Sequence, residues 1–134
     1  MNEIIKKRKK FNKAFSLPIN DKPTSITHTR ATLQYKMMLE ELNEYRDAKT
    51  IVDVADALID EFEILLGKFA ENGMLDLVPL LYYEVHKSNM SKLDDNGNPL
   101  INGENGVYDE TRPIGKVIKS KNFIEPDFAK ILNK

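Results

Sequence analysis

The sequence predicts an all-α protein, a bundle of four to five helices followed by an irregular C-terminal arm or a small hairpin. Two long stretches, 25–47 and 51–71, hold a single glycine and no proline, and both place apolar side chains at helical spacing. By contrast, residues 94–106 are rich in Asp, Asn, Gly and Pro. The first pattern favours long amphipathic helices, and the second favours turns.

The helices are predicted from their apolar patterns and end signals. A short, mostly polar helix is expected at 2–15, and a loop with two prolines at 17–23 separates it from the long helix at 25–47. After a break at 47–50, the helix at 51–71 carries a broad apolar stripe. An Asn-Gly pair follows this helix, as is typical of a C-cap.

The second half of the chain is predicted with shorter elements. Asp76 is expected to cap a fourth helix that runs to about Met90. The turn-rich stretch 94–106 then predicts a small hairpin or an extended arm, and Pro126 is expected to open a last short helix that ends at Leu132. We therefore expect a single domain, 1–134, with a helical core at about 2–93 and an arm at about 94–134.

Composition narrows the classes of function. The chain has 20 basic and 21 acidic residues, so no bulk charge favours a nucleic acid or a membrane surface as partner. It has no cysteine and two histidines, which excludes thiolate sites and favours a hard cation on oxygen ligands. No stretch is apolar enough for a membrane span or a secretory signal, so we expect a cytoplasmic protein. No glycine-rich phosphate loop is present either.

The strongest chemical signal is the placement of carboxylates on the two long helices. Glu41 and Glu44 stand three residues apart and Glu40 and Glu44 four apart, so they share a face of the first long helix. The second long helix carries its own acidic series, with no basic residue between Lys49 and Lys68: Asp53, Asp56, Asp60 and Glu63. Like charges at these spacings destabilise a helix by roughly 0.2–0.5 kcal/mol per pair. A divalent cation would convert this repulsion into attraction.

The short break at 47–50 predicts that the two long helices are antiparallel neighbours. Glu41 and Glu44 lie near the end of the first helix, and Asp53 and Asp56 lie near the start of the second. Four carboxylates are then expected to converge on one cation. The alternative is a solvated acidic face, which is common on exposed helices, and spacing alone does not decide between the two.

These motifs resemble those of the all-α nucleoside triphosphate pyrophosphohydrolases, the family that includes MazG proteins and phosphoribosyl-ATP pyrophosphohydrolase. Glu41-Leu42-Asn43-Glu44 matches its Glu-x-x-Glu pattern, and Asp53-Val54-Ala55-Asp56 resembles its Glu-x-x-Asp pattern with aspartate in the first place. The segment 84–93, which contains His-x-Ser-Asn-Met-Ser-Lys, and the segment 115–119 are similar to one subgroup. The likeness covers most of residues 11–125.

The resemblance implies hydrolysis of a nucleoside triphosphate, or a related nucleotide, between the α and β phosphates, giving a monophosphate and pyrophosphate. It also implies that Mg²⁺, or Mn²⁺, is held by four carboxylates: Glu41, Glu44, Asp53 and Asp56. Glu40 is the candidate to orient or deprotonate the attacking water. The candidate phosphate contacts are Asn89, Lys92, Arg30 and Lys119.

A short chain with apolar helix faces on several sides gains burial by association, and the resemblance points the same way, so we expect a homodimer or homotetramer. Phosphoribosyl-ATP, deoxyuridine triphosphate and other nucleotides all stay open as substrates. The competing class of protein is a non-catalytic helical module that binds a partner through the acidic stripe and the basic N-terminus.

Overall fold

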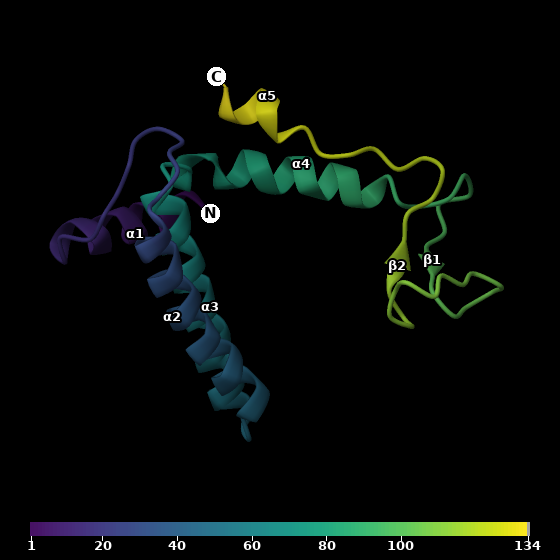
Figure 1. Ribbon diagram of the computed structural model, residues 1–134, viewed down its shortest axis with the longest axis horizontal. Helices are drawn as coiled ribbons and strands as arrows, with labels where there is room; N and C mark the ends of the chain where they lie inside the picture. Colours follow the sequence, from purple (N-terminus) through teal and green to yellow (C-terminus); the bar gives the residue numbers. More distant parts are fainter. Residues whose placement is uncertain (134) are drawn as a thin grey trace. The chain divides into compact units, whose positions relative to one another are not determined.

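The all-α prediction is confirmed by the structure, a computed structural model that describes residues 1–133. These residues form five α-helices, one 3-10 turn and one two-stranded hairpin (Figure 1). Contacts divide the chain into two compact units, Met1–Val78 and Pro79–Lys134. None of the helices in residues 1–133 combines the length and the apolar character that a membrane crossing requires.

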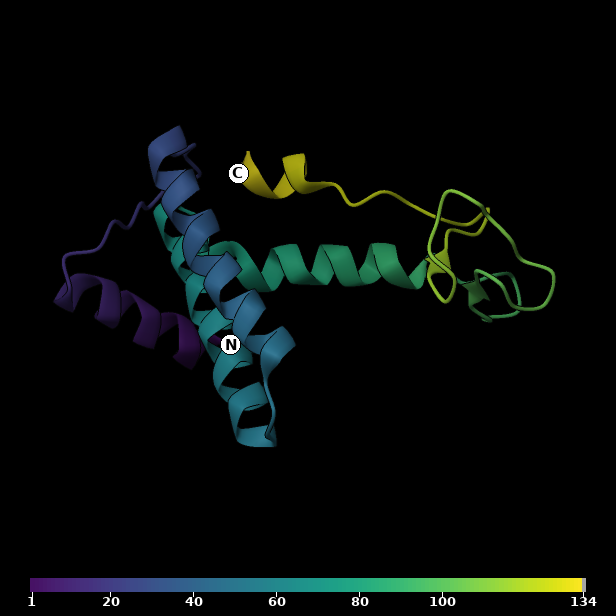
Figure 2. The ribbon, with the colours of Figure 1, turned by 60° about the horizontal axis from the view of Figure 1, so that its bottom comes forward.

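The first unit contains α1 (Asn2–Ala14), α2 (His28–Asp47) and α3 (Ile51–Glu71). Helices α2 and α3 run side by side in opposite directions, as the short break between them predicts (Figures 1 and 2). Helix α2 begins after Thr27, whose side-chain oxygen accepts a hydrogen bond from the backbone N–H of Arg30. This cap satisfies one of the N–H groups that a helix start leaves without an internal partner.

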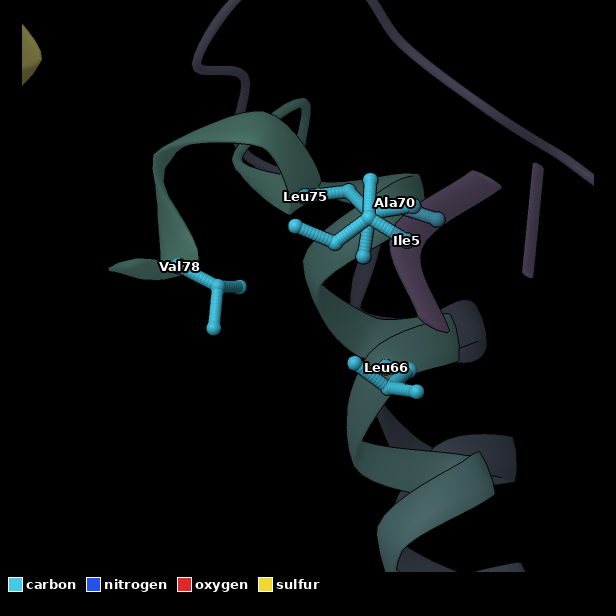
Figure 3. Close-up of a cluster of buried hydrophobic side chains, with 5 residues drawn as sticks. All are labelled: Ile5, Leu66, Ala70, Leu75 and Val78. Atoms are coloured by element: carbon cyan, nitrogen blue, oxygen red, sulfur yellow. The ribbon is translucent and has the colours of Figure 1, made fainter. Parts of the chain in front are cut away.

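The core of the first unit is small and lies where α1 crosses the C-terminal half of α3 (Figure 3). Phe62 and Phe69 of α3 pack against it from positions that are partly buried. Its buried members come from α1, α3, the turn that follows α3 and the first residue of α4: Ile5, Leu66, Ala70, Leu75 and Val78. Helix α2 contributes no buried residue at all. Most of the apolar surface of the α2–α3 pair is therefore not covered within one chain.

The C-terminal end of α3 is closed by the loop that precedes α2. Asn20 N–H donates to the carbonyl of Ala70 at 3.0 Å, and Thr24 N–H donates to that of Asn72 at 3.0 Å, so two of the terminal carbonyls gain partners. Gly73 turns the chain with φ of +69°, and a Cβ there would lie 1.8 Å from the carbonyl oxygen of Lys22. Only glycine fits this position, which confirms the predicted helix end.

The start of the fourth helix differs from the prediction. A 3-10 turn (Leu75–Leu77) precedes α4 (Val78–Met90), and the Asp76 side chain makes no capping hydrogen bond there. Instead, the Asp76 carboxylate accepts from Lys9 Nζ of α1 in an ion pair. The prediction that Asp76 caps this helix is therefore wrong, because α1 draws the carboxylate away from the helix end.

The second unit contains the rest of α4, the strands β1 (Leu100–Ile101) and β2 (Val117–Ile118), and α5 (Phe128–Leu132). The strands pair antiparallel, with Leu100 opposite Ile118, which confirms the small hairpin. Helix α5 is capped by Asp127, whose carboxylate accepts from the backbone N–H of Lys130 at 3.1 Å.

Serine side chains fasten the C-terminal tail to the end of α4. Ser88 Oγ donates to the carbonyl of Ile124 at 2.8 Å, and Ser91 Oγ accepts from the N–H of Ile124 at 2.8 Å. Ser120 Oγ donates to the carbonyl of Leu93 at 2.7 Å. The two serines of the His-x-Ser-Asn-Met-Ser-Lys motif therefore have a structural role in this unit.

Candidate metal centre

The antiparallel pairing of α2 and α3 surrounds Glu41 with other acids. The pKa of Glu41 is raised by burial and by the negative charges of its neighbours on both helices: Glu44, Asp60, Glu40 and Asp56. Burial is the larger cause, since it removes water from the charged form. Two of the other three predicted ligands, Glu44 and Asp56, and the predicted base Glu40 are thus within electrostatic range of Glu41.

Glu41 also has an oxygen that nothing satisfies. Its Oε2 is buried and has no hydrogen-bond partner in the protein. A buried acceptor without a donor costs about 1–3 kcal/mol, and more when it is charged. A hard divalent cation is the ligand that such an oxygen, with further carboxylates beside it, would accept most readily. The donor type, a carboxylate oxygen, is the one that Mg²⁺ and Mn²⁺ prefer.

Asp53, the fourth predicted ligand, takes part in the cap of α3 and not in the group of acids around Glu41. Its carboxylate accepts from the backbone N–H of Thr50 at 3.0 Å, and Thr50 Oγ1 accepts from the backbone N–H of Asp53 at 3.1 Å, which completes a capping box at the start of α3. Hydrogen bonding of the Asp53 carboxylate by the Thr50 side chain, and next by the Thr50 backbone N–H, holds the pKa of Asp53 below its ordinary value. Asp53 is not among the acids that act on Glu41.

The carboxylates do not form a closed ligand group within one chain. In residues 1–133, no three acidic or histidine side chains gather closely enough to hold a metal ion by themselves. The predicted ligand set stays a prediction. Asp60 is the residue that the predicted set leaves out and that the structure places near Glu41. Its signal was its position four residues after Asp56, one turn further along the same face.

The predicted phosphate contacts fall in both units. In the first unit, the guanidinium of Arg30 binds the buried Glu71 carboxylate through Nε at 2.6 Å and Nη2 at 3.1 Å. In the second unit, Lys92 Nζ donates to Asn89 Oδ1 at 2.8 Å, and Lys119 Nζ pairs with Glu125 at 3.1 Å. All four stay predictions, and Arg30 is the most fully engaged by the protein itself.

A cavity of about 320 Å³ lies between α1, α2 and α3 of the first unit. Its apolar lining includes Leu33 and Met37, and Asn12 supplies a buried amide whose Oδ1 has no hydrogen-bond partner. Met37 precedes Glu41 by four residues on α2, and Glu63, also in the lining, follows Asp60 by three on α3. The cavity therefore begins about one helical turn from the acidic cluster.

The fold and this cluster define an all-α protein with carboxylates gathered on two antiparallel helices. A family model described as phosphoribosyl-ATP pyrophosphohydrolase matches residues 8–89, which include α2, α3 and most of α4. The chain belongs to this family, whose members are nucleotide pyrophosphohydrolases. A search of the curated proteins found no match to the sequence.

Proposed function

We propose that this chain is a Mg²⁺-dependent pyrophosphohydrolase that cleaves a nucleoside triphosphate, or a related nucleotide, between the α and β phosphates. The observation that carries the proposal is the buried, unpartnered Oε2 of Glu41 among acids from two helices. An uncompensated acidic cluster destabilises the protein unless a cation binds to it. Family membership supplies the class of reaction.

In this proposal Glu41, Glu44 and Asp56 hold the cation, and Asp53 joins them by giving up its contact with Thr50. When bound, the cation supplies positive charge against the phosphate oxygens. Glu40 accepts a proton from water as the water oxygen attacks phosphorus and the bridging P–O bond breaks. The products are a nucleoside monophosphate and pyrophosphate.

The cavity between α1, α2 and α3 is the proposed binding site for the nucleoside. Its volume of about 320 Å³ lies within the range of about 300–1,000 Å³ that is usual for ligand pockets. Apolar side chains offer contact to a base, and Asn12 adds a polar group that is not fully satisfied. The cavity begins about one helical turn from the acidic cluster. A nucleotide could therefore place its base in the cavity and its phosphates at the acids.

We also propose that copies of this chain associate through α2 and α3. Helix α2 has 20 residues and none of them is buried. Large apolar side chains on these two helices remain exposed, including Leu33, Leu42, Leu58 and Ile59. A second copy would cover this surface, since each large apolar side chain gains about 1.5–3 kcal/mol on full burial. Light scattering coupled to size exclusion measures the resulting mass, and a monomer would contradict the association.

The test of activity is release of pyrophosphate from a panel of nucleotides, including phosphoribosyl-ATP and deoxyuridine triphosphate, with and without Mg²⁺. Glu41→Gln removes one ligand charge and should lower the Mg²⁺-dependent rate by about a hundredfold or more. Glu3→Gln is the matched control, because it removes one charge from an exposed side chain of α1 that is paired with Lys6.

Calorimetric titration with Mn²⁺ gives a second measurement that does not depend on choosing the right nucleotide. The wild type and Glu3→Gln should bind the ion, and Glu41→Gln should bind it more weakly. Absence of both Mn²⁺ binding and pyrophosphate release would reject the proposal. In that case the competing account, a non-catalytic module that binds a partner through the acidic face, would be the better one.

A further inference from the structure

The second unit contains a cavity that the acidic site does not use. It has a volume of about 250 Å³ and lies beside β2. Its charged lining consists of four cations and one carboxylate: Lys92, Arg112, Lys116, Lys119 and Asp109. All of these residues lie beyond the end of the segment that matches the family model, residues 8–89.

Part of this positive charge is not neutralised by the protein. Lys119 pairs with Glu125, but Arg112, Lys116 and Lys92 make no ion pair within residues 1–133. Lys92 donates a hydrogen bond to the neutral amide of Asn89. The single carboxylate of the lining, Asp109, accepts hydrogen bonds from the backbone N–H and the hydroxyl of Thr111. Arg112 is close enough to Asp109 to act on it electrostatically, so this carboxylate offsets part of the charge of Arg112.

The wall that carries these cations is held in place by Asn102. This side chain is fully buried, and its Nδ2 donates to the carbonyls of Asp109 and Arg112 at 2.9 and 2.8 Å while its Oδ1 accepts from the N–H of Asp109 at 2.7 Å. The backbone N–H of Asn102 donates to the carbonyl of Lys116 at 2.9 Å. The backbone that presents Arg112 and Lys116 is therefore fixed before any ligand arrives, which lowers the cost of ordering on binding.

We propose that this cavity binds an oligophosphate, either the phosphate chain of a nucleotide or free pyrophosphate. Ammonium and guanidinium groups form strong, charge-assisted hydrogen bonds with phosphate oxygens. A concave pocket of this size suits two or three linked phosphates, whereas a nucleic acid would need an extended basic stripe. This proposal adds a phosphate-binding site to the proposed function. It rests on that function only in taking a nucleotide or its product pyrophosphate as the source of the phosphate.

The test is calorimetric titration of the full chain with inorganic pyrophosphate in excess EDTA, so that no divalent cation links the ligand to the acidic helices. The wild type should bind pyrophosphate. The double variant Arg112→Gln/Lys116→Gln should bind it about a hundredfold more weakly, at about tenfold for each charge-assisted contact that is lost. The matched control, Lys121→Gln/Lys130→Gln, removes the same charge from side chains of this unit that do not line the cavity, and should bind pyrophosphate like the wild type.

Titration with a deoxynucleoside triphosphate under the same conditions distinguishes the two sources of phosphate. Tighter binding of the triphosphate than of pyrophosphate, if it is lost in Arg112→Gln/Lys116→Gln, assigns the cavity to a nucleotide, and equal binding assigns it to the phosphates alone. Glu41→Gln should keep pyrophosphate binding, so failure of the acidic site and failure of this cavity give different results. Lys116→Gln alone, at an exposed side chain, serves if the double variant does not fold.

Three results would overturn the proposal. The first is no pyrophosphate binding by the wild type, and the second is an equal loss in the double variant and its control. The third is tighter binding of a single-stranded oligonucleotide than of the triphosphate, which would indicate a nucleic-acid surface.

Discussion

Replacement of Arg30 by glutamine tests whether its guanidinium stabilises the first unit or serves a ligand. Arg30 makes two hydrogen bonds to the Glu71 carboxylate, and Gln34 Nε2 makes a third at 2.6 Å. The side chain of Glu71 is 8% exposed, whereas that of Arg30 is 39% exposed. The variant therefore removes two of these three hydrogen bonds and leaves the buried Glu71 carboxylate with the amide of Gln34 as donor.

The size of the effect follows from this unequal burial. Removal of one partner from a fully buried ion pair costs about 3–5 kcal/mol, and exposed pairs contribute about 0.2–1 kcal/mol. Because water screens the exposed guanidinium but not the carboxylate, we expect Arg30→Gln to lower the free energy of unfolding by about 2 kcal/mol. For a chain of this length, the midpoint of thermal unfolding should fall by about 6–10 °C.

The loss should depend on pH in a defined direction. The hydrogen bonds from Arg30 hold the pKa of Glu71 below its ordinary value of 4.5. A lowered carboxylate pKa contributes stability that is present above the unfolded-state pKa and is lost as the pH falls through the folded-state pKa. The difference between wild type and variant should therefore be full at about pH 7 and smaller at about pH 3.5. Urea unfolding followed by circular dichroism measures the free energy of unfolding of the wild type and the variant at each pH.

Arg46→Gln is the control, because Arg46 pairs with its exposed neighbour Asp47 and should show no measurable loss. Equal stability of Arg30→Gln and the wild type at about pH 7, or a difference that does not change in acid, would refute the reasoning. A variant that keeps its stability but has a raised KM for nucleotide would instead place Arg30 at the substrate, as the sequence predicts.

Three further predictions concern stability. Without divalent cation, Glu41→Gln should be more stable than the wild type at about pH 7. Because the pKa of Glu41 is raised, its contribution to stability is full below 4.5, the ordinary value, and is lost as the pH rises through the folded-state pKa. The urea midpoints of the wild type and of Glu41→Gln should therefore converge in acid. Gly73→Ala should lower the free energy of unfolding by more than about 2 kcal/mol, since its Cβ would clash with the carbonyl of Lys22. Gly97→Ala, which has open space around its Cβ, should lower it by about 1 kcal/mol. A comparable loss in both variants would contradict the clash. Leu66→Ala, at a residue 1% exposed, should lose about 3 kcal/mol by thermal unfolding, and a loss under about 1 kcal/mol would mean that this core is not the stabilising one.

The helices were predictable because their signals are local. Apolar spacing, the two prolines before α2 and the Asn-Gly pair after α3 each act within a few residues, and the predicted bounds of the first three helices agree with the structure within three residues. The hairpin was predictable only as one of two alternatives. Its strands are two residues long and are joined by residues 102–116, so too little periodicity was present to define them.

The sequence by itself determined the helical class, the bounds of the first three helices to within three residues and the presence of two acidic faces on consecutive helices. Only the tertiary structure decided which acids act on one another: Asp60 is near Glu41, and Asp53 caps its own helix. It also decided that Arg30 binds Glu71, 41 residues away in the chain. The physical reason is that spacing within a helix is set by the helix itself, whereas partners on different helices depend on how those helices pack and on which carboxylates find a donor closer at hand.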